Sequence, residues 1–147
     1  MASVAADRIF SGIKNAFEWE NISFRTHEEE PVLYAEYAIT DTRSITCMVR
    51  VSGTGEFILL RAFSLTSPIE DEGAKKIILS LCNEMNDNYM WTRFYLDKDN
   101  ELTAAIESPV TRKNAGKIAL KLLGKLVNLT AQAIERLDKL TEDVFQL

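Results

Sequence analysis

The sequence predicts an α+β fold: an antiparallel β-sheet packed with two shorter helices and one long C-terminal helix. Three observations predict it. Residues 44–51 alternate apolar and polar side chains, as half-buried strands do. Residues 67–109 run from an amphipathic helix through an asparagine-rich turn into a β-hairpin. Residues 115–147 repeat leucine and alanine every three or four positions, which is typical of a long helix.

The first half of the chain is predicted to form one helix and four strands. The helix covers Ser3–Phe17, because apolar residues recur there at helical spacing and Ser3 can cap its start. The strands are Glu18–Thr26, Val32–Ile39, Ser44–Val51 and Glu56–Leu65. Glycines between the last two can take positive φ, which favours a tight hairpin.

A second helix and a hairpin are predicted next. Ser67 fits an N-cap, Pro68 a first-turn proline and Glu70 the acid of a capping box. Asparagines at positions 83, 86 and 88 end the helix. The hairpin follows, with strands Tyr89–Asp97 and Glu101–Ser108.

The last predicted element is a helix over Thr111–Val144, which would be roughly 50 Å long. Gly124, Asn128 and Thr130 weaken its middle, so a kink there stays open. A sheet of about 20–30 Å is too short to bury such a helix. We therefore predict a homodimer whose interface includes Leu122, Leu126, Leu129, Leu137, Leu140 and Val144.

Length and composition favour a single domain over residues 1–147, long enough to bury a core. The chain has 17 basic and 22 acidic side chains and a net charge of −5, which argues against sequence-independent nucleic-acid binding. No apolar run approaches the roughly 20 residues of a membrane span, and the N-terminus lacks a signal-peptide pattern. We expect a cytoplasmic protein with no membrane or nucleic-acid partner. Cys47 and Cys82 are expected to be buried free thiols rather than a disulfide.

No pattern of catalytic, cofactor-binding or metal-ligating residues stands out, so we predict no catalytic residue, no cofactor and no metal. The single histidine, His27, precedes three glutamates in a predicted turn and is interpreted as solvated. The acidic runs at 28–30 and 70–72 do not by themselves bring together the six or more oxygens that a hard cation needs. The segment from Asp97 lacks the glycine and glutamate of a calcium loop at the sixth and twelfth places.

Charges are segregated along the predicted long helix. Its first half carries the basic residues Arg112, Lys113, Lys117, Lys121 and Lys125. Its second half carries the acidic residues Glu135, Asp138, Glu142 and Asp143. Three interpretations stay open: a solvated helix face, a surface for an anion, nucleic acid or acidic partner, and antiparallel pairing of two such helices.

Part of the sequence resembles a known family. The segment Asn83-Glu84-Met85-Asn86, the segment 91–97 (WTRFYLD) and the acidic hairpin turn after it are similar to the YbjN-type family. Its members are described as bacterial sensory-transduction regulators. The resemblance implies a bacterial protein with a fold similar to type III secretion chaperones, a curved antiparallel sheet packed with helices. It supplies no catalytic residues and implies protein binding or regulation rather than turnover.

We therefore expect a non-enzymatic interaction module, a regulator or chaperone-like binder, that acts as a homodimer with a protein partner. Trp91, Arg93 and Tyr95 share one face of the predicted hairpin strand and are the candidate partner-binding residues, because aromatic residues and arginine are favoured interface anchors. The long helix could equally cover them. The alternative is a small-ligand-binding protein or an enzyme with a pocket between sheet and long helix.

Overall fold

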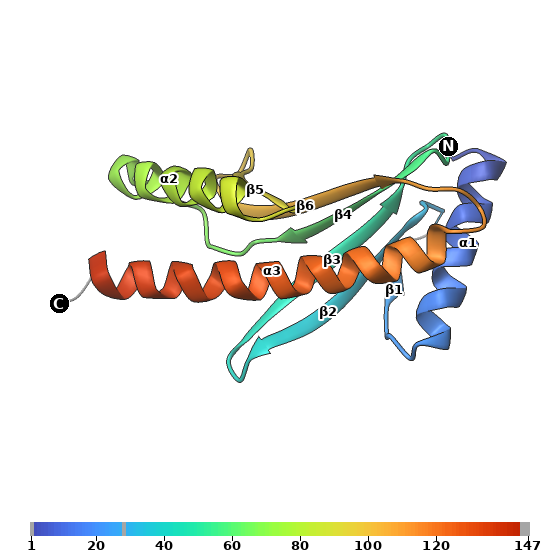
Figure 1. Ribbon diagram of the computed structural model, residues 1–147, viewed down its shortest axis with the longest axis horizontal. Coiled ribbons are helices and arrows are strands. Elements are labelled where there is room, and N and C mark those ends of the chain that lie inside the picture. The colour runs from blue at the N-terminus through green and yellow to red at the C-terminus, as the bar shows by residue number, and fades with distance from the viewer. Residues whose placement is uncertain (1, 28, 145–147) are drawn as a thin grey trace.

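The computed structural model describes residues 2–27 and 29–144 of the chain. Along the sequence its elements are α1 (Val4–Trp19), β1 (Arg25–Thr26), β2 (Val32–Thr40), β3 (Arg43–Val51), β4 (Phe57–Phe63), α2 (Glu72–Asn88), β5 (Arg93–Leu96), β6 (Leu102–Pro109) and α3 (Ala115–Val144). The strands form one antiparallel sheet in the order β1-β2-β3-β4-β6-β5. The curved sheet and long last helix confirm the predicted α+β class (Figure 1).

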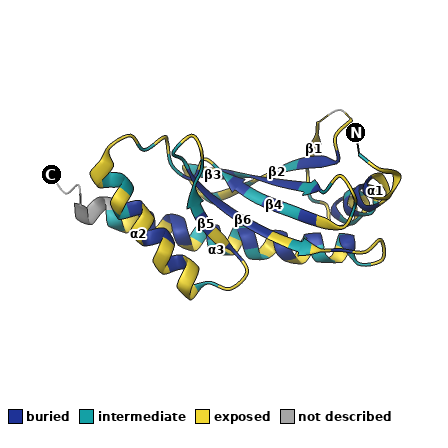
Figure 2. Ribbon diagram, turned by 90° about the horizontal axis from the view of Figure 1, so that it is seen from above, coloured by how far each residue is buried: buried dark blue, intermediate teal, exposed yellow. Residues whose placement is uncertain are grey.

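The helices cover one side of the sheet. α3 runs along it, α1 lies across one end and α2 lies at the other end (Figures 1 and 2). One hydrophobic core joins the helices to the covered side, and its largest fully buried side chains include Phe17, Leu60, Phe94 and Leu126. Such a core supplies most of the favourable free energy of folding.

α1 and α3 approach each other closely where they cross. A Cβ atom built on Gly116 of α3 would lie 2.9 Å from the Cβ of Ala16 and 3.1 Å from the carbonyl oxygen of Gly12, both in α1. Only glycine leaves room for the two backbones at this separation, because real Cβ atoms do not approach other atoms within about 3 Å.

The start of the chain differs from the prediction in one element. Ser3 caps α1 as predicted, accepting a hydrogen bond from the Ala6 amide at 3.0 Å. The predicted strand Glu18–Thr26 is wrong over most of its length, because α1 continues to Trp19 and only Arg25–Thr26 pairs with β2. Asn21 then reverses the chain with a φ of 57°, and the Phe24 ring packs edge-on against Phe17.

The start of α2 also differs. Asp71, not Ser67, is the N-cap, and its carboxylate accepts from the Ala74 amide at 2.8 Å. Residues 68–70 form an irregular connection instead, in which the Ile69 amide donates to the Asn100 carbonyl of the last hairpin. A tertiary hydrogen bond thus prevails over a local capping signal.

α3 is continuous over 30 residues, so Gly124, Asn128 and Thr130 do not break it. Its second half extends past most of the sheet and is covered by α2 (Figure 1). Ile78, Leu81 and Met85 of α2 share the core with Ala133, Ile134 and Leu137 of α3. Arg136 of α3 and Glu84 of α2 form an ion pair at 2.6 Å. α2 therefore shelters the apolar side of this half of α3 within the single chain, so the length of α3 does not by itself require the predicted second molecule.

Both cysteines are free and buried, as predicted. Burial raises the pKa of the Cys47 thiol to about 12 and that of Cys82 to about 11. Thiolates are the reactive form, so neither cysteine has the lowered pKa of a nucleophile. Within the described ranges, no helix is both long and apolar enough to pass through a bilayer.

Candidate functional site

The side of the sheet opposite the helices is the main candidate surface. Successive residues of a strand point to opposite faces. Leu33, Cys47, Leu60 and Ile106 belong to the helix-side core, so their neighbours along each strand point away from the helices. No element within residues 2–27 and 29–144 covers this second side (Figures 1 and 2). We call it the open face and define it by Tyr34, Met48, Arg50, Leu59, Arg61, Phe63, Arg93, Tyr95, Thr103, Ala105 and Glu107.

One row of the open face crosses the whole sheet. Its members are consecutive register partners on the six strands: Arg25, Tyr34, Met48, Arg61, Ala105 and Arg93. Met48 and Ala105 are buried although they lie outside the helix-side core. The larger side chains around them, among them Tyr34, are half-buried. The open face is therefore a mixed aromatic, aliphatic and cationic surface rather than the polar outer side of an ordinary antiparallel sheet.

Carboxylates accompany most arginines on this side. Arg25 pairs with Glu36 at 3.8 Å, Arg50 pairs with Glu30 at 3.4 Å, and Arg93 pairs with Glu107 across β5 and β6. Arg25 also lies over the Tyr34 ring, 4.9 Å from its centre. Exposed pairs of this kind add little stability, but they fix the positions of the charges.

Asn86 of α2 closes the free edge of the sheet at β5. Its side-chain nitrogen donates to the Phe94 carbonyl at 3.0 Å, and its side-chain oxygen accepts from the Phe94 amide at 2.7 Å. The amide group thus replaces the backbone of a neighbouring strand. Exposed edges invite pairing with other chains, and covering them is a common protection. The sequence predicted Asn86 as a helix-ending residue and as part of the segment that resembles the YbjN-type family, but it did not predict the pairing with an edge strand.

A hollow of about 540 Å³ lies on the open face beside the β5–β6 turn, between Arg61 and Tyr95 and the turn residues. Asp97 organises that turn. Its Oδ1 accepts from the amides of Asp99 and Glu101, and its Oδ2 accepts from the Thr103 hydroxyl. Burial raises the pKa of Asp97, but these hydrogen bonds outweigh burial and hold the pKa below its usual value. The carboxylate is therefore ionised and already engaged.

A second depression lies between β2 and α3, the place that the alternative function requires. It is a groove of about 450 Å³ with mainly apolar walls that include Ile39, Leu123, Gly124 and Val127. Tyr37 and Asn128 are its polar side chains. Burial, together with the nearby Cys47, raises the pKa of Tyr37, so its hydroxyl stays neutral. The groove offers few convergent polar groups to a small ligand.

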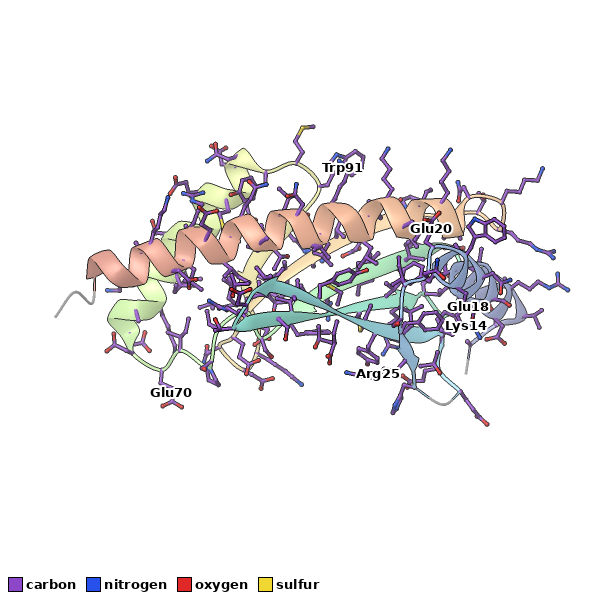
Figure 3. All side chains as sticks on the ribbon, turned by 90° about the horizontal axis from the view of Figure 1, so that it is seen from below. Lys14, Glu18, Glu20, Arg25, Glu70 and Trp91 are labelled. Atoms are coloured by element: carbon purple, nitrogen blue, oxygen red, sulfur yellow. The ribbon has the colours of Figure 1, made fainter. Side chains whose placement is uncertain are left out.

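The predicted partner-binding residues do not lie on one surface. Arg93 and Tyr95 belong to β5 and point to the open face, opposite the buried Phe94. Trp91 precedes the strand, with a φ of 76°, and the residue is 64% exposed. Figure 3 shows Trp91 projecting on the α3 side of the molecule, whereas Arg25 projects from the other side. The strand alternation used in the prediction does not reach Trp91, since β5 begins at Arg93.

The predicted interface leucines have different environments. Leu122, Leu126 and Leu137 are buried within the chain, so a partner could not reach them in this conformation. Leu129 and Leu140 pack against the core but are partly exposed. The side chain of Val144 lies outside the described residues. The exposed face of α3 is instead formed by polar and small residues: Lys117, Lys121, Gly124, Asn128, Gln132, Glu135, Asp138 and Lys139.

The remaining candidates for metal or acid–base chemistry stay apart. His27 is exposed just before the β1–β2 turn, and the acidic residues 70–72 are exposed at the start of α2. In the part of the chain that the structure describes, no three histidine, cysteine or acidic residues come together in a way that could hold a metal ion.

The fold and this surface define an α+β protein with one helix-covered and one uncovered sheet face. A family model described as "Putative bacterial sensory transduction regulator" (YbjN) matches residues 12–141. The chain therefore belongs to the YbjN family. The crystal structure of YbjN, a "putative transcription regulator" from E. coli, superposes with a TM-score of 0.62 over 94% of this chain and 93% of that chain. Only 14% of residues are identical, so this likeness shows the fold alone. No curated protein matches the chain.

Proposed function

We propose that the chain is a non-enzymatic, cytoplasmic regulator that binds an extended segment of a protein partner across its open face, much as a chaperone holds its client. The family's description supports a regulatory or binding role. The observation that carries the proposal is the open face itself, a full sheet surface with half-buried aromatic, aliphatic and arginine side chains. Surfaces of this composition are favoured in protein interfaces.

The binding geometry follows from the edges of the sheet. A partner strand cannot add to β5, because Asn86 already occupies the Phe94 amide and carbonyl. At the other edge, β1 has only two residues and pairs with β2 only at Leu33 and Tyr34. We place the partner segment on the face, where Leu59 and Phe63 flank Arg61 on the central strand β4.

Selection of random peptides from a display library on the immobilised protein tests this function. We expect enriched peptides whose binding is lost in the Leu59→Asp variant, because a carboxylate would then stand in the middle of the open face. Leu79→Asp is the matched control, since Leu79 is a 51% exposed leucine on α2, away from that face. Circular dichroism checks that both variants fold. No enrichment over a protein-free support, or equal loss in both variants, would contradict the proposal.

We also infer that two copies pair through the exposed face of α3. Its basic first half and acidic second half become complementary when two such helices run antiparallel about Asn128. Lys121 of one copy then lies beside Glu135 of the other. Gly124 sits near the centre, and a Cβ atom there would meet nothing within 4 Å in the single chain. A small residue at that point allows a close helix–helix approach.

Gly124→Leu should therefore give a monomer by light-scattering mass, with its helix content unchanged. The added side chain has room in the single chain but would stand between the two paired helices. Ser11→Leu on the exposed side of α1 is the control and should keep the wild-type mass. A wild-type protein that is already monomeric, or a dimeric Gly124→Leu protein, would overturn the pairing.

A further inference from the structure

Arg61 is distinguished from the other arginines of the open face by its lack of a partner. It lies on the central strand β4, between the buried Met48 and Ala105 in the row that crosses the sheet. Its side chain is half-buried, and its Nε is fully buried without a hydrogen-bond partner among the described residues. Arg25, Arg50 and Arg93 each pair with a glutamate, whereas Arg61 has no ion pair with any described residue.

The half-buried Arg61 side chain, whose buried Nε has no hydrogen-bond partner among the described residues, is less favourable in the free protein than a paired arginine. Removing a charge from water is costly unless a carboxylate and hydrogen bonds replace the lost hydration. Met48 and Ala105 offer Arg61 neither. A residue that lowers the stability of the free protein without supporting the fold is expected where the protein binds a partner.

The residues around Arg61 favour some anionic ligands over others. The charged residues that line the adjoining hollow are Arg61 and Lys98 on one hand and Asp97, Asp99 and Glu101 on the other. Asp97 is held by hydrogen bonds within the turn, and Glu101 accepts from the Ser64 hydroxyl at 2.9 Å, so both are engaged elsewhere. Their negative charge repels any anion, and it repels a phosphate dianion or a nucleic-acid backbone more strongly than a singly charged carboxylate. One planar guanidinium matches one carboxylate, through two parallel hydrogen bonds.

We infer that Arg61 is the anchor for an aspartate or glutamate side chain of the partner, and that this acidic residue is flanked by apolar residues. The inference rests on the proposed function and specifies its ligand. Phe63 and Leu59 lie along β4 on the same face, two residues to either side of Arg61. A partner segment extended along β4 would bring its own alternate side chains onto them while its acid meets Arg61.

The display selection described above tests this ligand class with purified wild-type protein. Enriched peptides should carry one acidic residue between apolar ones. A synthetic copy of an enriched peptide should bind the Arg61→Gln variant about ten- to a hundredfold more weakly, the loss typical of a charged hydrogen-bonded pair. Arg61→Lys keeps the charge but loses the planar fork and should bind with intermediate affinity. Arg8→Gln removes one positive charge from the exposed side of α1 and should bind normally.

The outcomes separate the two proposals. Enriched peptides without an acidic residue, or unchanged affinity in Arg61→Gln, overturn the role of Arg61 and leave the open-face function standing. Absence of any enriched peptide contradicts the function and this inference with it. Preferential binding of short phosphorylated peptides or of an oligonucleotide would also overturn the carboxylate assignment.

A stability measurement distinguishes a binding role from a structural one. Arg61→Met removes the unpaired charge and keeps most of the side-chain volume, so the melting temperature should stay the same or rise. A clear fall would mean that Arg61 supports the fold, and it would overturn the inference.

Discussion

A leucine in place of Gly116 should lower the free energy of unfolding by about 3 kcal/mol or more, at the upper end of what overpacking costs. The substituted side chain would enter the crossing of α1 and α3, where even a Cβ atom lies 2.9 Å from the Cβ of Ala16 and 3.1 Å from the Gly12 carbonyl oxygen. Neither neighbour can rotate out of the way, because one is a backbone atom and the other is attached directly to the backbone. The helices would have to separate and uncover part of the core. Urea denaturation followed by circular dichroism measures the loss.

Two alanine substitutions, at Gly12 and at Gly116, test whether the close approach of α1 and α3 causes this loss of stability. Alanine is favoured over glycine inside helices by about 1 kcal/mol. Gly12 lies on the α1 side of the same crossing, but a Cβ atom there meets nothing within 4 Å. Gly12→Ala should therefore stabilise the protein, whereas Gly116→Ala should destabilise it. Stabilisation by Gly116→Ala as well as by Gly12→Ala would show that the helices can move apart without cost.

Replacing Asn86 by leucine should lower the free energy of unfolding by about 2–4 kcal/mol, the cost of leaving two partly buried backbone groups without partners. Asn86 is the residue that accepts from the Phe94 amide and donates to its carbonyl. Without it, the exposed edge of β5 should also promote association at high concentration. Thermal unfolding and light scattering on the same samples measure the two effects.

Asn83 provides the matched control, because it is an exposed asparagine one turn earlier in α2. Asn83→Leu should change stability by less than about 0.5 kcal/mol, as surface substitutions usually do. Asn86→Asp should fall between the two, since a carboxylate can accept from the Phe94 amide but cannot donate to its carbonyl. Equal losses at positions 83 and 86 would contradict the role given to the Asn86 amide.

The sequence predicted those elements whose periodicity matches their burial. The alternation of residues 44–51 predicted β3 to within one residue, and the spacing of apolar residues predicted α1 and α3. The predictions failed where contacts between distant segments decide the structure. The Ile69 amide donates to the Asn100 carbonyl, and this bond keeps residues 68–70 out of α2. Asn21 adopts a positive φ and turns the chain, so only two residues of the first predicted strand form a strand.

The candidate site was less predictable than the fold, for a physical reason. The β5 alternation placed Arg93 and Tyr95 on one face, but it could not show that Trp91 lies before the strand. Arg61 lies in the predicted strand Glu56–Leu65, whose nearly all-apolar sequence is typical of a central strand and does not indicate a binding residue. Which arginines find a carboxylate depends on strand register, which a single sequence does not provide.

The continuity of α3 links the two ends of the molecule. The helix rises about 1.5 Å per residue, so its 30 residues form a rod of about 45 Å. α1 packs against the first turn of α3, and α2 packs along its last turns (Figure 1). Because an unbroken helix resists compression and bending, we expect that a displacement of α2 would be transmitted along α3 to its contact with α1. The two ends of the molecule thus share one continuous helix as their support.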